Sequence, residues 1–211
     1  MPKRVDLSHI RFLGGATDSG KTTVAQILAA RHGWRLYHYD RTDLAHHQRL
    51  VQTDTDIRQR MNASLDDNWV KPTPQELMQR TLRSFELRFP LVIEDLLALP
   101  KDTRILAEGF GLTPALLQPL IADSAQAIWL FPTETFKRES MTRRGKPSFG
   151  NKVSDPQWAK QNLFERDMML AAYLQTQARE FDFQIMIIDG SQTPDDVANI
   201  IEPHFGLTTH H

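Results

Sequence analysis

The sequence of 211 residues contains no cysteine and no long apolar run. Without cysteine the chain forms no disulfide, no thiolate metal site and no cysteine nucleophile, and the redox compartment is left open. No apolar stretch approaches the ~18 residues that a membrane-spanning helix needs, so we expect no membrane partner. The first residues, MPKRVD, have none of the apolar core of a signal peptide, and we therefore expect a cytoplasmic protein.

The sequence also lacks an excess of charge of either sign. Lysine and arginine total 25 against 26 aspartates and glutamates, a formal net charge of −1. Nucleic-acid-binding proteins usually carry a basic field, often interleaved with aromatic side chains, whereas the aromatic residues here are scattered. We therefore expect no nucleic-acid partner. The composition is that of an ordinary globular protein, 40% hydrophobic and 24% charged, and the length suits a single domain over residues 1–211.

A glycine-rich segment near the N-terminus carries the strongest chemical signal. Residues 15–22 read GATDSGKT, which fits the pattern G-x-x-x-x-G-K-[ST]. Its glycines let the backbone turn so that several N–H groups point inward at a phosphate. Lys21 can reach the β- and γ-phosphates, and Thr22 can hold Mg²⁺ through its hydroxyl. The predicted nucleotide-binding residues are Gly15, Ala16, Thr17, Asp18, Ser19, Gly20, Lys21, Thr22 and Thr23.

The flanking residues supply the setting that this motif requires. Residues 9–13 are apolar enough for a strand, and residues 21–31 predict a helix with Val24 and Leu28 on one face. An accidental glycine-rich turn is the alternative, but it does not explain why a strand and a helix flank the segment. Arg11 suits a central strand only if it lies at the exposed start of that strand.

Four more apolar segments alternate with helical ones. Strands are expected at residues 34–40, 104–109, 125–131 and 184–190. The first of these reads as half-exposed, and the last has the composition of a strand buried on both faces. Helices should begin where a capping side chain precedes a proline, at residues 73, 113, 155 and 193. This alternation predicts an α/β fold, a parallel sheet wrapped by helices on both sides, with ligands at the carboxyl ends of its strands.

Residues 41–100 contain no obvious strand. We expect a polar helix over residues 44–61, a loop over residues 62–71, and a long helix from Thr73 towards residue 99. Pro90 should kink or divide that long helix.

Two carboxylates follow predicted strands and are the leading catalytic candidates. Asp40 could orient an acceptor hydroxyl and accept its proton, although a simple turn aspartate is the alternative. Glu108 could bind Mg²⁺ directly or through water, unless it is a buried, hydrogen-bonded acid. Gly109 would let a substrate approach the backbone closely. Arg41 and Asp43 could contact the acceptor.

A basic segment after the fourth strand predicts a mobile lid over about residues 133–155. Arg143 or Arg144 could close on the phosphates and stabilise charge in the transition state, and Arg138 is a weaker candidate. A solvated charged face is the alternative interpretation.

Weaker signals complete the list of candidates. Residues 189–190 could border a nucleotide base or form a simple turn. Trp69 and residues 66–67 could line an acceptor pocket or lie on an exposed loop. His46 and His47 lack a metal-binding spacing, and we interpret them as surface residues.

Together these motifs resemble the P-loop small-molecule kinases of the uridine kinase and phosphoribulokinase type, with adenylate and shikimate kinases as more distant relatives. The resemblance rests on GATDSGKT, Tyr-Asp at 39–40, ILAEG at 105–109, the basic residues at 138–144 and IDG at 188–190. It implies a three-layer P-loop kinase fold with a five-stranded sheet in the order 2-3-1-4-5. It also implies an acceptor-binding helical insertion at about 41–100 and a lid at about 133–155.

The resemblance also assigns roles to residues. ATP and Mg²⁺ are the implied cofactors, with Lys21, Asp40, Arg143 and Arg144 as catalytic residues, and Thr22 and Glu108 as metal ligands. The sequence thus predicts an ATP-dependent transfer of the γ-phosphoryl group to a hydroxyl or phosphate of a small molecule, which is the expected partner. A homodimer is left open, and the sequence after Asp40 matches no acceptor signature.

A P-loop ATPase or a nucleotide-dependent switch without a small-molecule acceptor is the alternative. The string NKVS at residues 151–154 has serine where a GTPase carries the aspartate that reads guanine. The acid after the third strand is a glutamate, whereas a motor ATPase carries an aspartate there. Both departures favour the kinase.

Overall fold

A single parallel sheet forms the centre of the protein. The computed structural model describes residues 6–145, 147 and 149–207. The strands are β1 (Ile10–Gly15), β2 (Arg35–His38), β3 (Ile105–Glu108), β4 (Ala127–Pro132) and β5 (Gln184–Ile188). They pair in the order β2-β3-β1-β4-β5, which confirms the predicted sheet order.

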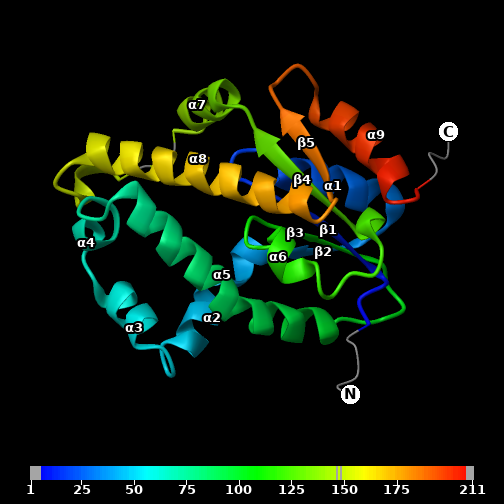
Figure 1. Cartoon of the computed structure of the whole chain (residues 1–211), viewed down its shortest axis with the longest axis horizontal. Helices are drawn as coiled ribbons and strands as arrows, with labels where there is room; N and C mark the ends of the chain where they lie inside the picture. The colour runs from blue at the N-terminus through cyan, green and yellow to red at the C-terminus, as the bar shows by residue number, and fades with distance from the viewer. Residues whose placement is uncertain (1–5, 146, 148, 208–211) are drawn as a thin grey trace.

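Helices cover both faces of this sheet (Figure 1). On one face lie α1 (Lys21–His32) and α9 (Pro194–His204), and on the other lie the long helices α5 (Pro74–Leu97) and α8 (Pro156–Glu180). Successive strand residues alternate between the two layers, because side chains of a strand point to opposite faces. Phe12 packs in the core beneath α5 and α8, and its neighbour Leu13 packs in the core beneath α1 and α9. The predicted α/β class is therefore confirmed.

The expected helix starts are correct. Thr73 and Thr193 each form a reciprocal capping box with the acid three residues later, and Asp155 accepts a hydrogen bond from the backbone of Trp158. Arg11 lies one residue inside β1 and is half-buried, and its guanidinium donates to the carbonyl of Ser8 at 3.1 Å. The guanidinium therefore finds carbonyl partners at the beginning of the strand through Nη1, whereas its buried Nε has none among the described residues.

The segment between β2 and β3 is more divided than predicted. It contains η1 (Tyr39–Thr42), α2 (Asp43–Leu50), α3 (Thr55–Asn62) and α4 (Leu65–Trp69), which pack along α5 at the left of Figure 1. The single helix expected over residues 44–61 is two helices, and the expected loop at 62–71 contains α4. The reason is capping, because the side chains of Asp54 and Ser64 each accept a backbone N–H and begin a new helix.

Pro90 does not divide α5, which runs through it as one helix. The proline is exposed, whereas Phe85 before it and Val92 and Leu96 after it are buried in the same core. Packing on both sides of the proline therefore outweighs the loss of one backbone hydrogen bond.

One further expectation about burial needs correction. β5 is an edge strand rather than one buried on both faces, and Ile187 is 45% exposed. The predicted lid segment begins with α7 (Glu134–Arg143), whose buried residues are Lys137, Ser140 and Met141, and its movement as a lid stays a prediction. Lys146, part of the same basic segment, lies outside the described residues.

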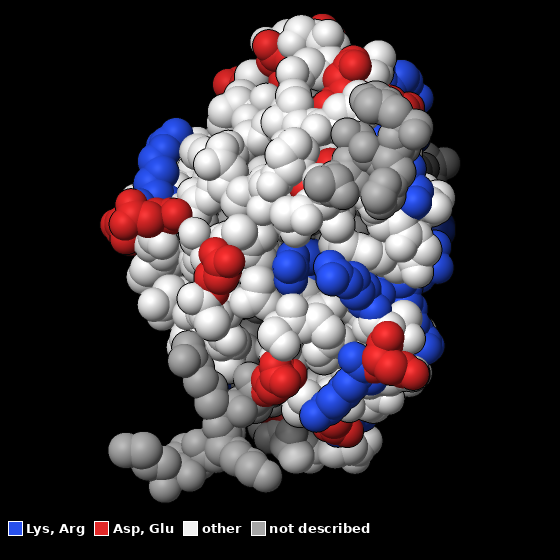
Figure 2. Space-filling view, turned by 90° about the vertical axis from the view of Figure 1, so that its right-hand side faces the viewer, with Lys and Arg blue, Asp and Glu red and all other residues white. Residues whose placement is uncertain are grey.

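The remaining elements are α6 (Pro114–Leu117), η2 (Ser124–Gln126) and η3 (Gly150–Lys152). No helix in the described part of the chain combines the length and apolar character needed to cross a membrane. On the face shown in Figure 2, acidic and basic side chains lie interspersed, in keeping with the balanced composition.

Candidate active site at the phosphate loop

The glycine-rich segment forms a closed loop between β1 and α1. Gly15 has a φ of +119°, and a Cβ there would lie 2.0 Å from the carbonyl oxygen of Leu130, so only glycine fits. Gly20 is the N-cap residue of α1 in the left-handed conformation, which turns the helix N-terminus toward the loop. The Lys21 ammonium donates to the carbonyl of Ala16 at 2.8 Å and closes the loop.

A cavity of about 370 Å³ lies beside this loop. Its lining residues are Thr17, Asp18, Gly20, Lys21, Thr22, Thr23, Asp40, Met141, Arg144, Pro147, Leu163, Arg166 and Asp167. The structure thus brings Asp40 and Arg144 together with the loop. Ala16 and Ser19, which also belong to the loop, are buried and do not line the cavity. Arg143 and Glu108 are not among the lining residues.

Asp40 lies in η1, directly after β2, with its carboxylate open to the cavity. Asp40 is exposed at the cavity mouth, yet the surrounding protein atoms partly desolvate its carboxyl and raise its pKa, and the nearby Lys21 ammonium opposes that rise. Burial likewise lowers the pKa of Lys21, which Asp40 and Glu108 counteract. A carboxylate whose pKa is raised is a better proton acceptor, which is what the role predicted for Asp40 requires.

Glu108 connects the phosphate loop to β2. The hydroxyl of Thr22 donates to one carboxylate oxygen of Glu108 at 3.1 Å, and His38 Nδ1 lies 2.8 Å from the other. Thr22 and Glu108, the two predicted metal ligands, therefore lie side by side. The described residues contain no cluster of three His, Cys, Asp or Glu side chains that could hold a metal ion. Sequence reasoning missed His38, although its place two residues before Asp40 on an alternating strand was a usable signal.

The basic residue that reaches the loop from α7 is Lys137, which the sequence analysis did not select. Its ammonium, 1% exposed, donates to Thr17 at 2.7 Å, Asp167 at 2.8 Å and Asp18 at 3.0 Å. Thr17 in turn donates to Asp167 at 2.6 Å. A buried cation thus ties the phosphate loop to α7 and α8.

The helical period of α7 decides which predicted arginine faces the cavity. Lys137, Met141 and Arg144 follow the spacing i, i+4, i+7 and share the inner face. Both Arg143 and Arg144 are exposed, but Arg144 lies 3.5 Å from Asp18 and lines the cavity, whereas Arg143 does not line it. Arg138 pairs with the exposed Glu134 outside the cavity. Of the predicted arginines, only Arg144 is placed for a role at the loop.

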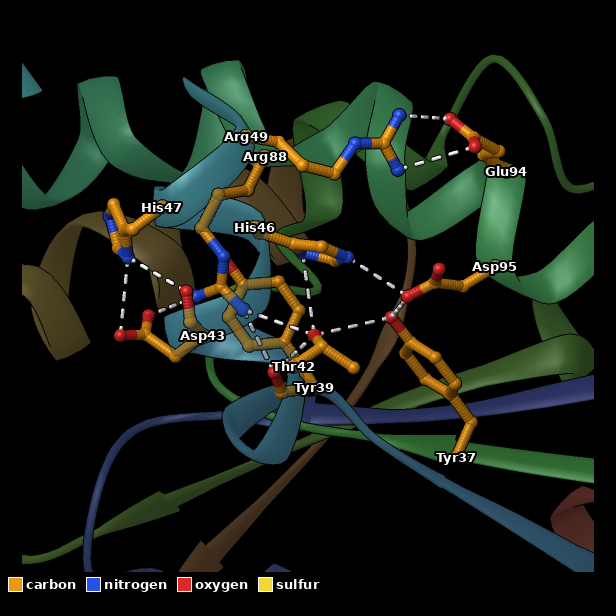
Figure 3. A network of polar contacts seen from close by, with 10 residues as sticks. All are labelled: Tyr37, Tyr39, Thr42, Asp43, His46, His47, Arg49, Arg88, Glu94 and Asp95. Carbon is orange, nitrogen blue, oxygen red and sulfur yellow. Dashed lines mark hydrogen bonds and ion pairs between the residues drawn. The ribbon is translucent and has the colours of Figure 1, made fainter. Parts of the chain in front are cut away.

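A polar network holds the turn that presents Asp40 (Figure 3). Arg88, 1% exposed, donates to the carbonyl of Tyr39 at 2.9 Å, to Thr42 Oγ1 at 3.3 Å and to Asp43 at 2.6 Å. Its guanidinium also stacks on the Tyr39 ring, 3.9 Å from the centroid. Arg88 therefore fixes η1 from both sides of Asp40.

His46 belongs to the same network and is buried, contrary to the expectation of a surface residue. It is 3% exposed, and its Nε2 lies 2.9 Å from Asp95, which also accepts from Tyr37 at 2.9 Å. Burial lowers the pKa of His46, which favours its neutral form. The period of α2 turns this histidine toward α5, and the polar sequence gave no sign of that burial.

A second cavity, of about 350 Å³, lies among the helices between β2 and β3. Its lining residues are Asp43, Leu44, His47, Ile57, Arg60, Met61, Asn68, Trp69, Leu77, Arg80, Thr81, Ser84, Phe85, Arg88, Phe110 and Arg166. Trp69 and Asp43 lie where an acceptor pocket was predicted. Arg166 lines both cavities, so the two cavities adjoin at this residue.

The other weak candidates lie elsewhere. Asp66 accepts the backbone N–H of Ser154, and Asp67 pairs with Lys71 on the surface. Arg41 and Asp189 are exposed and line neither of these cavities.

The space beside Gly109 is filled by the Tyr39 ring rather than open to a substrate, because a Cβ there would lie 2.3 Å from Tyr39 Cβ. The expectation for Gly109 was therefore wrong.

Comparison with known proteins supports the fold. No protein-family model matches the sequence, and no curated protein is significantly similar to it. Among solved structures, deoxyadenosine kinase from M. mycoides with bound dATP is similar, with a TM-score of 0.50 and 11% identity over 93% of this chain and 99% of that one. Shikimate kinase from Acinetobacter baumannii with shikimate gives 0.49 and 16%, covering 93% of each chain.

A sugar kinase from Janibacter sp. gives a TM-score of 0.44 and 14% identity, over 95% of this chain and 98% of that one. Of these three structures, the deoxyadenosine kinase reaches 0.50, and at 11% identity it establishes a P-loop kinase fold and not an activity. The resemblance to uridine kinase and phosphoribulokinase in particular stays a prediction.

Proposed function

We propose that this protein is an ATP-dependent phosphotransferase that acts on a hydroxyl or phosphate group of a small molecule. One observation carries the proposal: Lys21 and Asp40 share a cavity at the phosphate loop, next to a second cavity that also contains Arg166. Lys21 would bind the donor phosphates, and Asp40 would orient the acceptor and take up its proton. An ATPase that uses water has no need of the second cavity, which favours transfer to an acceptor.

The oxygen donors beside the loop fit the magnesium ion that accompanies ATP. Thr22 and Glu108 present a hydroxyl and a carboxylate, the ligand types that Mg²⁺ prefers, and they would hold the ion. Bound there, Mg²⁺ would neutralise charge on the phosphates. His38 would keep the Glu108 carboxylate oriented through the second oxygen. Arg144, on the inner face of α7, would approach the phosphates from the opposite side of the cavity.

An acceptor screen combined with one substitution tests the proposal. Purified protein with ATP and Mg²⁺ is assayed for ATP consumption against nucleosides, nucleotides, sugars and coenzyme precursors. Asp40→Asn should lower the rate of transfer to the acceptor by about 10²- to 10⁴-fold, the usual size of general-base catalysis. ATP affinity should change far less than the transfer rate, because the donor phosphates would be held by the loop and Lys21, while Asp40 would act on the acceptor. Asp102→Asn, at the opposite end of the sheet, is the control and should behave as wild type.

The raised pKa of Asp40 gives a second readout. Because the carboxylate must be deprotonated to accept a proton, transfer should fall as the pH drops through that raised pKa, above the ordinary aspartate value. Steady ATP hydrolysis that no acceptor changes, and that a protein partner stimulates, would instead support the ATPase alternative.

A further inference from the structure

The second cavity is rich in positive charge. Four arginines line it, Arg60, Arg80, Arg88 and Arg166, and its only acidic lining residue is Asp43. Asp43 is already paired, with Arg88 at 2.6 Å and His47 at 3.2 Å. The carboxylate inside the cavity therefore does not balance the other three arginines.

Arg60 and Arg80 have only backbone partners. Arg60 donates to the carbonyl of Arg80, and Arg80 donates to the carbonyl of Asp67, each at 3.4 Å. Over residues 6–145, 147 and 149–207, neither forms an ion pair with a carboxylate. Nη2 of Arg60 is buried and has no hydrogen-bond partner. Burial, and next the Arg80 charge, lower the pKa of Arg60, so the two cations repel each other.

The acids near these arginines are engaged elsewhere. Asp54 and Asp56 act weakly on Arg60, but both are ion-paired with Arg83 outside the cavity, at 2.7 Å and 3.5 Å. Arg166 differs, because its Nε lies 2.8 Å from Asp167 at the phosphate loop. The uncompensated charge is thus concentrated at Arg60 and Arg80. An unpaired buried donor and two neighbouring cations cost stability, which an anionic ligand would recover.

Much of the remaining cavity wall is apolar, and the polar side chains in it are those of His47, Asn68, Thr81 and Ser84. Trp69, Phe85 and Phe110 contribute aromatic rings, and Leu44 and Met61 are 62% and 44% exposed at its edge. The volume is in the range of small-molecule sites. Such a wall suits a flat or apolar body attached to the anionic group.

We propose that the acceptor is an organic anion, a carboxylate or phosphate ester on a ring-sized apolar body. Arg60 and Arg80 bind its anionic group, and its reacting end lies toward Arg166 and Asp40. Calling this ligand the acceptor rests on the proposed kinase function. The anion-binding site itself depends only on the residues that line the cavity.

Direct binding tests the site without any catalysis. The probes are benzoate, phenyl phosphate and the neutral isostere benzamide, followed by fluorescence of Trp69 with the phosphate loop saturated by ADP and Mg²⁺. One of the two anions should bind about tenfold or more tightly than benzamide, the size expected of charge-assisted hydrogen bonds. The preferred anion distinguishes a carboxylate from a phosphate ester. Trp69→Phe identifies the fluorescence change that comes from this cavity.

Substitutions then test whether Arg60 and Arg80 are the residues that bind the anion. Arg60→Gln and Arg80→Gln should each weaken anion binding about tenfold. Arg49→Gln, which removes an exposed ion pair with Glu94 outside the cavity, should leave it within about twofold. The melting temperature of Arg60→Gln should equal or exceed that of wild type, because the repulsion is relieved. A purely structural arginine would give the opposite result.

Each outcome decides the inference. The inference is overturned if benzamide binds as tightly as both anions or if neither anion binds. It is also overturned if the acceptor is neutral and Arg60→Gln phosphorylates it as well as the wild type does. Anion binding that follows the substitutions, in a protein that phosphorylates nothing, would support the anion site and refute the kinase. The two proposals therefore fail separately.

Discussion

Tyr39 shows how one side chain sets the position of the candidate base. Its ring is buried against the chain after β3, with Gly109 and Gly111 in contact with it, and Asp40 follows it directly. At Gly109 the backbone has a φ of +153°, and an added Cβ would lie 2.3 Å from Tyr39 Cβ. Neither atom is at the end of a flexible side chain, so the overlap cannot relax without moving the backbone.

Gly109→Ala should therefore lower the free energy of unfolding by about 3 kcal/mol or more, from backbone strain and overpacking together. Unfolding of the variant and the wild-type protein in denaturant measures this difference in free energy. Gly33→Ala is the matched control, because Gly33 also has positive φ, +64°, but no atom lies within 4 Å of an added Cβ. That variant should lose only about 1 kcal/mol. Equal losses in the two variants would show that the Tyr39 contact does not matter.

The place of a residue in the candidate site was predictable from sequence where a charged or glycine residue directly follows an apolar strand. The phosphate loop and the acids after β2 and β3 fall in this group, and the structure brings Asp40, Thr22 and Glu108 to one end of the sheet. Lys137 and His38 were missed because a lone basic residue in a polar segment looks the same in sequence whether it is buried or solvated. Their roles depend on partners far away in the sequence: Glu108 lies 70 residues from His38, and the partners of Lys137 lie 30 to 120 residues from it.

At the scale of elements, α7, α8 and the phosphate loop are joined by one buried ion cluster. Lys137 is 1% exposed, and the side chains of Asp18 and Asp167 are 14% and 5% exposed. Without the lysine, Asp18 would keep only the partly exposed Arg144 as a cationic partner, at 3.5 Å, and Asp167 would keep only Arg166, at 2.8 Å. Lys137 is therefore the cation that links α7 to the loop and to α8.

Lys137→Met should lower the free energy of unfolding by about 2 kcal/mol or more, because three hydrogen bonds of a buried ammonium are lost while Arg144 and Arg166 still face the two carboxylates. Arg138→Met is the control, since it removes the next residue from an exposed pair with Glu134 and should change stability by about 1 kcal/mol or less. Adding Asp167→Asn to Lys137→Met should cost less than the sum of the single changes, by about 1–3 kcal/mol. Strict additivity in urea unfolding would argue against the cluster.

Element boundaries were the least predictable feature between β2 and β3. The division of the segment before α5 into η1, α2, α3 and α4 depends on the side chains of Asp54 and Ser64, which accept backbone N–H groups as N-caps. Many surface residues of these types do not cap a helix. Pro90 gave the opposite error, because tertiary packing along α5 overrides a strong local breaker. The sequence identifies Asp54 and Ser64 as residues that can cap a helix and Pro90 as one that can break it. It does not show whether tertiary packing overrides these local preferences.

At the scale of the whole molecule, the alternation of strands and helices was sufficient for the fold class. Sheet order came from the resemblance, and the structure confirms it. β5 was misjudged because an apolar strand has the same composition at the centre and at the edge, and only the order reveals that one side of β5 is unpaired. The division into one domain with two insertions stays a prediction.

The last prediction concerns how the stability of the whole fold depends on pH. Glu202 of α9 is 1% exposed and lies 3.1 Å from Arg31 and 3.0 Å from His32 of α1. Burial alone would raise the pKa of Glu202, but the contacts with His32 and Arg31 outweigh it and hold that pKa below the ordinary value of 4.5. Since the unfolded chain binds the proton more readily, this carboxylate stabilises the fold above pH 4.5 and loses that effect as the pH falls through its lowered pKa.

Glu202→Gln should therefore lower the free energy of unfolding by about 1–3 kcal/mol near neutral pH, where a charged hydrogen bond is lost. The difference from wild type should shrink below pH 4.5, because the wild-type carboxylate becomes protonated and then resembles the amide. Urea unfolding between about pH 7 and pH 3 measures the two curves, and Glu86→Gln, on the exposed side of α5, should follow wild type throughout. A constant offset between Glu202→Gln and wild type over this range would mean that the link between α1 and α9 depends on shape and not on charge.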